Sequence, residues 1–220
     1  MNMKFKIAFF DCDGVLSLGN TWLELHKSVG ISAEKNFQWR SQFYKGEITW
    51  EQWFENIEPY YRQSNLRRKD FSRVLNKILI NQEANKLFKG LKKFGMKTAI
   101  ISGSVDQHVE RISKHLGTDM WRANTSIKYD ENGFFERFVN VSDELQAKEI
   151  FIKEICSGFK VKPTETFFVG DSINDSAAFR LTQHGILYKN IGRPEDIELE
   201  KYAWRKIDNL IQILSISNER

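Results

Sequence analysis

The stretch Asp11-Cys12-Asp13-Gly14-Val15 directly follows a short apolar run, and this pairing of a strand with two carboxylates is the starting point for predicting the fold. Residues 4–10 are β-prone and end at Asp11, so two carboxylates stand two positions apart at the carboxyl end of a buried strand. Gly14 allows the backbone to turn sharply at this point. Taken alone, the stretch fits a polar turn as well as a reactive pair of carboxylates.

Two further strands are predicted to end in polar residues in the same way. Residues 97–101 stop at Ser102, and residues 166–169 stop before Gly170 and Asp171. Helical patterns at residues 82–94, 106–116 and 146–155 lie between or beside the strands, with Asn81 as a predicted N-cap. Strands that alternate with helices indicate a mostly parallel sheet, which binds ligands at the carboxyl ends of its strands. We therefore expect an α/β, Rossmann-like three-layer core with its site at this edge.

Residues 17–79 interrupt the alternation, because they hold aromatic-rich helical stretches and no convincing buried strand. We expect residues 17–79 to form a small helical cap inserted into a catalytic core made of residues 1–16 and 80–220. Core packing explains the aromatic residues of the cap better than contact with an apolar or flat leaving group does. Residues 124–141 predict a β-hairpin. Residues 186–188 and 204–207 predict two more strands, followed by a helix capped by Asp208.

Composition narrows the partners and the compartment. The 33 Lys+Arg and 29 Asp+Glu residues give a net charge of +4, and the basic residues are scattered, which favours a solvated surface over nucleic-acid binding. Cys12 and Cys156 are too few for a disulfide framework or a zinc site, and the four histidines show no paired metal spacing. No stretch is long enough to cross a bilayer. We expect a cytoplasmic protein that binds neither nucleic acid nor membrane.

The segment Gly170-Asp171-Ser172-Ile173-Asn174-Asp175 brings more carboxylates to the same sheet edge. Clustered carboxylate oxygens suit a hard cation such as Mg²⁺, and Asp171, Ser172 or Asn174 could cap the following helix at the same time. Ser102 and Gly103 can offer a hydroxyl and a backbone N–H to an anion. Lys148 lies on a charged helix, where a lysine is ordinarily solvated.

The order strand-DxD, strand-Ser, helix-Lys and strand-GDxxND resembles the four motifs of the haloacid dehalogenase-like hydrolase superfamily, over nearly the whole chain. The Ser-Gly-Ser form of the second motif, the GDSIND form of the fourth and the helical insertion look most like the phosphoserine phosphatase-like branch. This resemblance implies a Mg²⁺-dependent phosphatase that hydrolyses a small-molecule phosphate monoester through an aspartyl-phosphate intermediate.

The resemblance also implies a role for each motif residue. Asp11 would attack phosphorus, and Asp13 would act as general acid and then general base. Mg²⁺ would be bound by Asp11, Asp13, Asp171 and Asp175, with the main-chain carbonyl of Asp13 as its ligand atom. The phosphoryl oxygens would be held by Ser102, Gly103, Lys148 and Asn174.

The substrate stays open, and the cap sequence does not favour phosphoserine. Asn20 stands about where phosphoserine phosphatases carry a cap glutamate, and the residues after Phe54 lack their cap arginine. In another alignment Glu24, Arg40 or Arg62 could substitute.

Three alternative functions stay open beside the phosphatase. The first is a phosphotransferase on the same scaffold, whereas Asp13 argues against a dehalogenase, because a departing halide needs no general acid. The second is a receiver-like signalling module, which the DxD spacing and the cap disfavour. The third is a catalytically silent family member.

Overall fold

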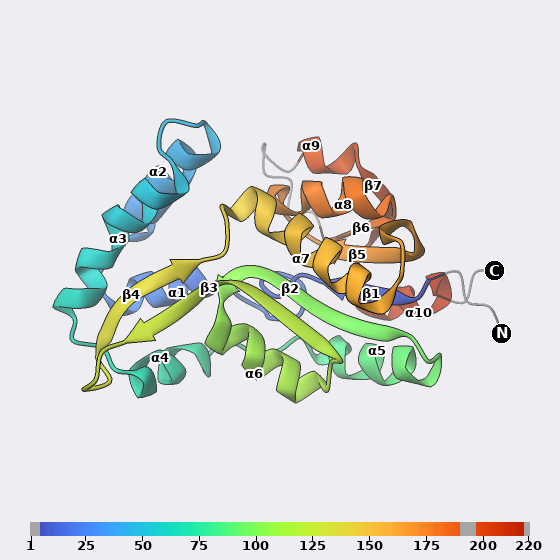
Figure 1. The fold of residues 1–220 in the computed structure, drawn as a ribbon, viewed down its shortest axis with the longest axis horizontal. Helices are drawn as coiled ribbons and strands as arrows, with labels where there is room; N and C mark the ends of the chain where they lie inside the picture. Colours follow the sequence, from blue (N-terminus) through green and yellow to red (C-terminus); the bar gives the residue numbers. More distant parts are fainter. Residues whose placement is uncertain (1–4, 190–196, 218–220) are drawn as a thin grey trace.

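The computed structural model describes residues 5–189 and 197–217, and its centre is one seven-stranded sheet (Figure 1). The strand order is β4-β3-β2-β1-β5-β6-β7, and every neighbouring pair is parallel except β3 and β4. The strands are β1 (Ile7–Phe10), β2 (Lys97–Val105), β3 (Met120–Tyr129), β4 (Phe135–Asn140), β5 (Thr166–Gly170), β6 (Gly185–Tyr188) and β7 (Ala203–Ile207). Residue 4, the expected start of the first strand, lies outside the described residues.

Helices cover both faces of the sheet, because side chains alternate along its buried strands. In β1, Ala8 and Phe10 face one apolar cluster, whereas Ile7 and Phe9 face another. The first cluster is covered by α5 (Gln82–Lys93), α6 (Asp106–Leu116) and α10 (Ile213–Ile216). The second is covered by α7 (Glu144–Phe159), α8 (Ser176–Thr182) and α9 (Ile197–Glu200), on the opposite side in Figure 1. The predicted three-layer α/β fold is confirmed.

Four helices and no sheet strand lie between β1 and α5, as predicted. They are α1 (Thr21–Ser28), α2 (Ala33–Tyr44), α3 (Trp50–Gln63) and α4 (Arg68–Leu75). Their starts follow ordinary capping chemistry, since the side chains of Asn20, Ser32 and Thr49 accept backbone N–H bonds at the first turns of α1, α2 and α3.

Most aromatic residues of these four helices form a core of their own. Trp22, Trp53 and Tyr61 are buried, and they pack together with Phe135 and Phe138 of the β3–β4 hairpin. Figure 1 shows why: the outer part of the hairpin extends beyond β2 and lies between α3 and α4. Core packing is thus confirmed for most of these aromatic residues, whereas Phe37 of α2 is exposed, and the hairpin supplies part of that core.

The β3–β4 hairpin matches its prediction. Asp130 Oδ1 accepts the N–H groups of Asn132 and Phe134 across the turn, and Gly133 adopts the left-handed conformation with a φ of 79°.

Two details differ from the sequence-based expectation. Strand β2 does not stop at Ser102 but continues to Val105, because pairing with β3 resumes after an irregularity between these two residues. At the other end, Asn209 rather than Asp208 is the capping residue, since its side chain accepts the N–H of Ile211 in a short 3-10 turn.

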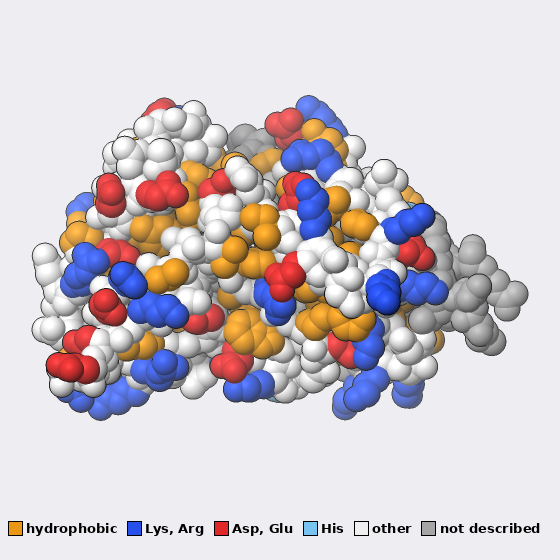
Figure 2. All heavy atoms as spheres, viewed as in Figure 1, with side chains coloured by type: hydrophobic (Ala, Val, Ile, Leu, Met, Phe, Trp, Pro, Cys, Tyr) orange, Lys and Arg blue, Asp and Glu red, His pale blue; other side chains and the backbone are white. Residues whose placement is uncertain are grey.

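Charge is distributed in small groups on the face of the molecule that Figure 2 shows. On the face shown in Figure 2, basic and acidic side chains alternate, with small hydrophobic patches between them. Within residues 5–189 and 197–217, no helix combines the length and the apolar composition of a membrane span.

Candidate active site

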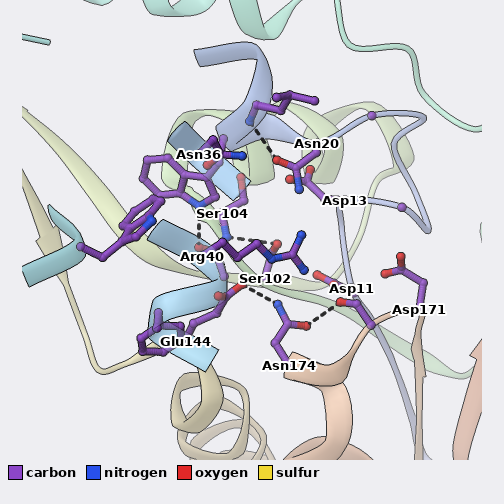
Figure 3. A pocket seen from close by; sticks show the side chains of 18 of the residues that line it. Asp11, Asp13, Asn20, Asn36, Arg40, Ser102, Ser104, Glu144, Asp171 and Asn174 are labelled. Carbon is purple, nitrogen blue, oxygen red and sulfur yellow. Dashed lines mark hydrogen bonds between the residues drawn. The ribbon is translucent and has the colours of Figure 1, made fainter. Parts of the chain in front are cut away.

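The predicted site residues meet at one edge of the sheet. Strand β1 lies between β2 and β5, so Asp11 and Asp171, which directly follow β1 and β5, stand beside Ser102, which lies near the end of β2. They line a cavity of about 400 Å³ that is also lined by residues of α1, α2 and α3. Figure 3 shows Asp11, Asp171 and Asn174 on the sheet side of this cavity, and Asn20, Asn36 and Arg40 on its helical side.

Lys148 is the centre of the charged network. It is fully buried, and its Nζ donates to Asp11 Oδ2 and to Asn174 Oδ1, each at 2.9 Å, and forms an ion pair with Asp175. Burial alone would lower the pKa of Lys148, but the Asp11 and Asp175 carboxylates raise it above its usual range. The ammonium is therefore charged and fixed beside Asp11, unlike the solvated lysine that its helix alone would suggest.

Three carboxylates form a group that fits a divalent cation. Oxygens of Asp11, Asp171 and Asp175 all lie within 4.8 Å of one another. Two glycines make the close approach possible: a Cβ on Gly14 would clash with the Asp171 carboxylate, and one on Gly170 would clash with Asp175. Hard oxygen donors of this kind are the ligands that Mg²⁺ prefers.

Asp175 differs from the other two carboxylates in how its oxygens are used. Oδ1 pairs with Lys148, while Oδ2 accepts the backbone N–H groups of Asp171 at 3.0 Å and Ser172 at 3.1 Å. Burial raises the pKa of Asp175 to about 6, against the opposing effect of Lys148. Both oxygens are therefore engaged in holding the loop after β5 in place.

Asp13 points toward the start of α1. Thr21 donates to it from both its backbone N–H and its hydroxyl, each at 2.8 Å, and Ser17 donates at 3.2 Å. Burial raises the pKa of Asp13 to about 6, although the hydrogen bonds from Thr21 oppose the rise. A carboxyl group that titrates near neutrality suits proton transfer at physiological pH.

His108 was assigned no role from the sequence, yet it contacts Asp13, with its Nε2 3.5 Å from Asp13 Oδ1. Burial, with a smaller effect of Arg111, lowers the pKa of His108 to about 3, so the imidazole is neutral. Cys12 lies within 4.8 Å of both groups, and burial raises the pKa of its thiol, which keeps it protonated. Packing in the core describes Cys12 better than reactivity does.

Ser102, Gly103 and Asn174, three of the residues expected to hold the phosphoryl oxygens, all line the cavity. The Ser102 hydroxyl oxygen accepts the N–H of Ser104 at 3.3 Å, and both serines are buried. Asn174 Nδ2 donates to Glu144 Oε1 at 2.6 Å, which leaves its Oδ1 directed at Lys148.

Glu144 is a site residue that the sequence analysis missed. It lines the cavity, lies against Gly103, and its second oxygen accepts the Tyr44 hydroxyl of α2 at 3.2 Å. A signal was available, because Glu144 stands four residues before Lys148 and therefore on the same face of α7. Thr21 and His108 had no comparable signal, since they reach Asp13 only through the packing of α1 and α6.

A family model of haloacid dehalogenase-like hydrolases matches residues 5–181. The chain belongs to this family. This match assigns the chain to an enzyme family and not to the receiver-like signalling modules.

Curated relatives and solved structures agree with the predicted phosphoserine phosphatase-like branch. A phosphoserine phosphatase of Archaeoglobus fulgidus is 24% identical over 218 residues, which cover 99% of this chain but only 62% of that protein. One of Methanocaldococcus jannaschii is 25% identical over 212 residues, covering 94% of this chain and 98% of the relative. A solved phosphoserine phosphatase, described as a phospho-aspartyl intermediate analogue, superposes with a TM-score of 0.80 at 23% identity, over 96% of this chain and 98% of that one. This hydrolase thus has the fold of that branch.

Proposed function

We propose that this hydrolase is a Mg²⁺-dependent phosphatase that cleaves a small-molecule phosphate monoester through an aspartyl-phosphate on Asp11. The observation that carries the proposal is the buried Lys148. Its ammonium contacts Asp11, which follows β1, and Asn174 and Asp175, which come after β5. Such an arrangement fixes the orientation of a carboxylate nucleophile and places a positive charge where phosphoryl oxygens would gather.

In the first step, a carboxylate oxygen of Asp11 attacks phosphorus, an Asp11–phosphate bond forms, and the bond to the departing alkoxide breaks. Asp13 gives its proton to the alkoxide oxygen. In the second step water attacks the phosphorus, Asp13 accepts a proton from it, and inorganic phosphate leaves Asp11 as a carboxylate. The pKa of about 6 allows Asp13 to serve in both forms.

Ser102, the Gly103 N–H, Lys148 and Asn174 would hold the phosphoryl oxygens. Mg²⁺ would be bound by the carboxylates of Asp11 and Asp171 and by the main-chain carbonyl of Asp13. When bound, the ion neutralises charge between the anionic nucleophile and the anionic substrate. The oxygens of Asp175 already accept from Lys148 and from two backbone N–H groups. Asp175 would therefore lie next to the Mg²⁺ ligands and hold them in position.

Residues 17–79 would act as the cap over a core of residues 1–16 and 80–220. Its helices α1–α3 line the side of the cavity opposite Asp11, so they would exclude bulk water and contact the leaving group.

Phosphate release from a panel of phosphate monoesters tests this function. We expect activity with Mg²⁺, little activity after EDTA treatment, and recovery when Mg²⁺ is added back. Asp11→Asn should abolish turnover with the fold intact by circular dichroism, while Asp208→Asn, a change at an exposed carboxylate away from the cavity, should leave activity unchanged. Full activity in EDTA, or undiminished hydrolysis by Asp11→Asn, would refute the mechanism.

A further inference from the structure

His108 is a fully buried polar residue that takes part in no step of the proposed mechanism. It lies on α6, and both of its ring nitrogens face polar groups. Nε2 lies 3.3 Å from the Ser17 hydroxyl oxygen and 3.5 Å from Asp13 Oδ1, while Nδ1 lies 3.4 Å from Nη2 of Arg111 on the same helix. A buried imidazole with partners on both sides has a fixed orientation, because leaving either nitrogen unsatisfied would cost free energy.

Arg111 determines which ring nitrogen of His108 carries the proton. A guanidinium group has donors only, so the Arg111 Nη2 can pair with Nδ1 only if Nδ1 accepts. In the neutral imidazole the proton then resides on Nε2, the nitrogen that faces Ser17 and Asp13. The same Nη2 also donates to the backbone carbonyl of Ile78 at 2.9 Å, which holds the guanidinium in place. His108 is therefore a donor toward the loop that follows β1.

The Ser17 hydroxyl extends this donation to Asp13. Ser17 is buried, and its Oγ accepts from His108. Its own proton is therefore directed at Asp13 Oδ1 at 3.2 Å or at the Cys12 carbonyl oxygen at 3.3 Å. The loop backbone fixes Ser17, because its N–H donates to the Cys12 carbonyl at 2.9 Å. The hydrogen bonds from Arg111 through His108 and Ser17 thus run in one direction and end at the Asp13 loop.

We propose that His108, set in its Nε2–H tautomer by Arg111, positions the Asp13 carboxyl group for proton transfer. The inference rests on the proposed phosphatase function and adds a positioning residue to it. A general acid must lie within hydrogen-bonding reach of the leaving oxygen, and a carboxyl group that rotates loses this alignment. Thr21 holds the carboxyl group from α1, and His108 holds it from α6. His108 itself touches no substrate, since it is fully buried and outside the described cavity lining.

The tautomer of His108 can be measured without any substrate. We expect long-range ¹H–¹⁵N correlation spectra of the whole protein near neutral pH to show the proton on Nε2, with the signals assigned by their loss in His108→Gln. In Arg111→Met, which removes the guanidinium donor and keeps an apolar stem, the His108 signals should shift toward the other tautomer. A proton on Nδ1 in the wild type, or unchanged signals in Arg111→Met, would overturn the proposal.

Two phosphate esters of similar size separate positioning of the acid from a merely structural effect. The alkoxide that leaves benzyl phosphate needs a proton, whereas p-nitrophenyl phosphate releases a stable phenolate. With Mg²⁺, we expect His108→Leu to lower kcat/KM about tenfold to a hundredfold on benzyl phosphate and less than about threefold on p-nitrophenyl phosphate. His108→Gln, which keeps an amide donor near the position of Nε2, should recover benzyl phosphate hydrolysis to within about threefold of the wild type. Equal losses on both esters, or full activity of His108→Leu on benzyl phosphate, would contradict the positioning role.

The p-nitrophenyl ester also isolates the second step, in which Asp13 takes a proton from water. In His108→Leu we expect a stoichiometric burst of p-nitrophenol followed by slow turnover, with kcat and KM lowered together. Steady release without a burst would mean that Asp13 is still placed for that step, against the proposal. His115→Leu, at an exposed histidine of the same helix, is the matched control and should behave as the wild type does.

The failure of this inference differs from the failure of the proposed function. Absence of Asp11-dependent phosphate release from every ester of the panel would refute the proposed function. Equal losses on two esters that the wild type cleaves through Asp11 would refute the role of His108 alone. Arg111→Met leaves the buried ring in place, so it should fold and show the same contrast between the two esters with a smaller loss.

Discussion

At the scale of single residues, the strongest effects in this molecule come from polar groups that burial forces into fixed partnerships. Lys148 is charged in the interior because two carboxylates face it, and Asp13 titrates near neutrality because burial outweighs its hydrogen bonds from Thr21. Neither property could be obtained from residue type and helix position alone, since both depend on side chains that are distant in the sequence.

The buried His26 side chain makes the free energy of unfolding depend on pH. Its Nδ1 lies 2.9 Å from Asn36 Oδ1, its Nε2 has no partner among the described residues, and burial lowers its pKa to about 4. In the unfolded chain the pKa returns to 6.5, so the unfolded state binds the proton more readily. The stabilisation from the neutral imidazole is therefore complete above about pH 6.5 and falls as the pH drops toward 4, by up to about 3 kcal/mol.

Urea unfolding at pH 7 and pH 4.5 measures this effect. His26→Asn keeps an amide donor for Asn36 and removes the titration, so its free energy of unfolding should fall less between the two pH values than that of the wild type. The variant must be compared with the wild type, because Asp13 and Asp175 also titrate. Their raised pKa values make the fold more stable as the pH falls, which is opposite to the effect of His26. His115→Asn, at an exposed position, should behave as the wild type does. Parallel pH profiles for His26→Asn and wild type would contradict the prediction.

At the scale of elements, a hydrogen bond between Tyr44 and Glu144 joins α2 to α7 at the site. The Tyr44 hydroxyl donates to Glu144 Oε2, whose other oxygen accepts from Asn174. Asn174 Oδ1 in turn accepts from Lys148. The position of α2 is therefore coupled to the orientation of Lys148, which is proposed to bind the phosphoryl group. We expect Tyr44→Phe to lower kcat/KM by about two- to fivefold, equivalent to a loss of roughly 0.4–1 kcal/mol.

A double-mutant cycle checks this link. If the bond carries the effect, adding Glu144→Gln to Tyr44→Phe should cost less than the sum of the two single changes. Tyr60→Phe serves as the control, because the Tyr60 hydroxyl accepts from exposed Lys35 and lies outside the cavity lining. Additive effects in the cycle would show that Tyr44 acts by packing alone.

The elements that local chemistry defines could be predicted well. Helix α5 begins after Asn81, and α6 ends at Leu116 before the left-handed Gly117, both at the expected residues. The extension of β2 through Val105 could not be predicted, because pairing with β3 carries the strand past Ser102. The same division holds at the site: motif residues at strand ends were found, whereas residues that arrive by tertiary packing, such as Thr21, were not.

At the scale of the whole molecule, the β3–β4 hairpin ties the four inserted helices to the sheet. Phe138 of β4 lies 5.3 Å from Trp22, 5.5 Å from Phe54 and 5.0 Å from Tyr61, measured between ring centres. The helical core therefore depends on a side chain that the sheet provides. Phe138→Ala should lower the free energy of unfolding by about 3–5 kcal/mol, because a buried aromatic ring is replaced by a cavity.

The location of this loss distinguishes two ways in which the molecule can open. If the helices between β1 and α5 unfold as a unit apart from the sheet, Phe138→Ala should increase amide hydrogen exchange in α1 and α3 while exchange in β1 and β5 stays slow. Val139→Ala, at the neighbouring position with 38% exposure, is the matched control and should cost less than about 1 kcal/mol. Equal loss of protection in α3 and β1 would mean that helices and sheet open together. If helices and sheet open together, activity should fall in proportion to the unfolded fraction. If the helices unfold alone, the site should be impaired while the sheet and the Lys148 network at its edge stay folded.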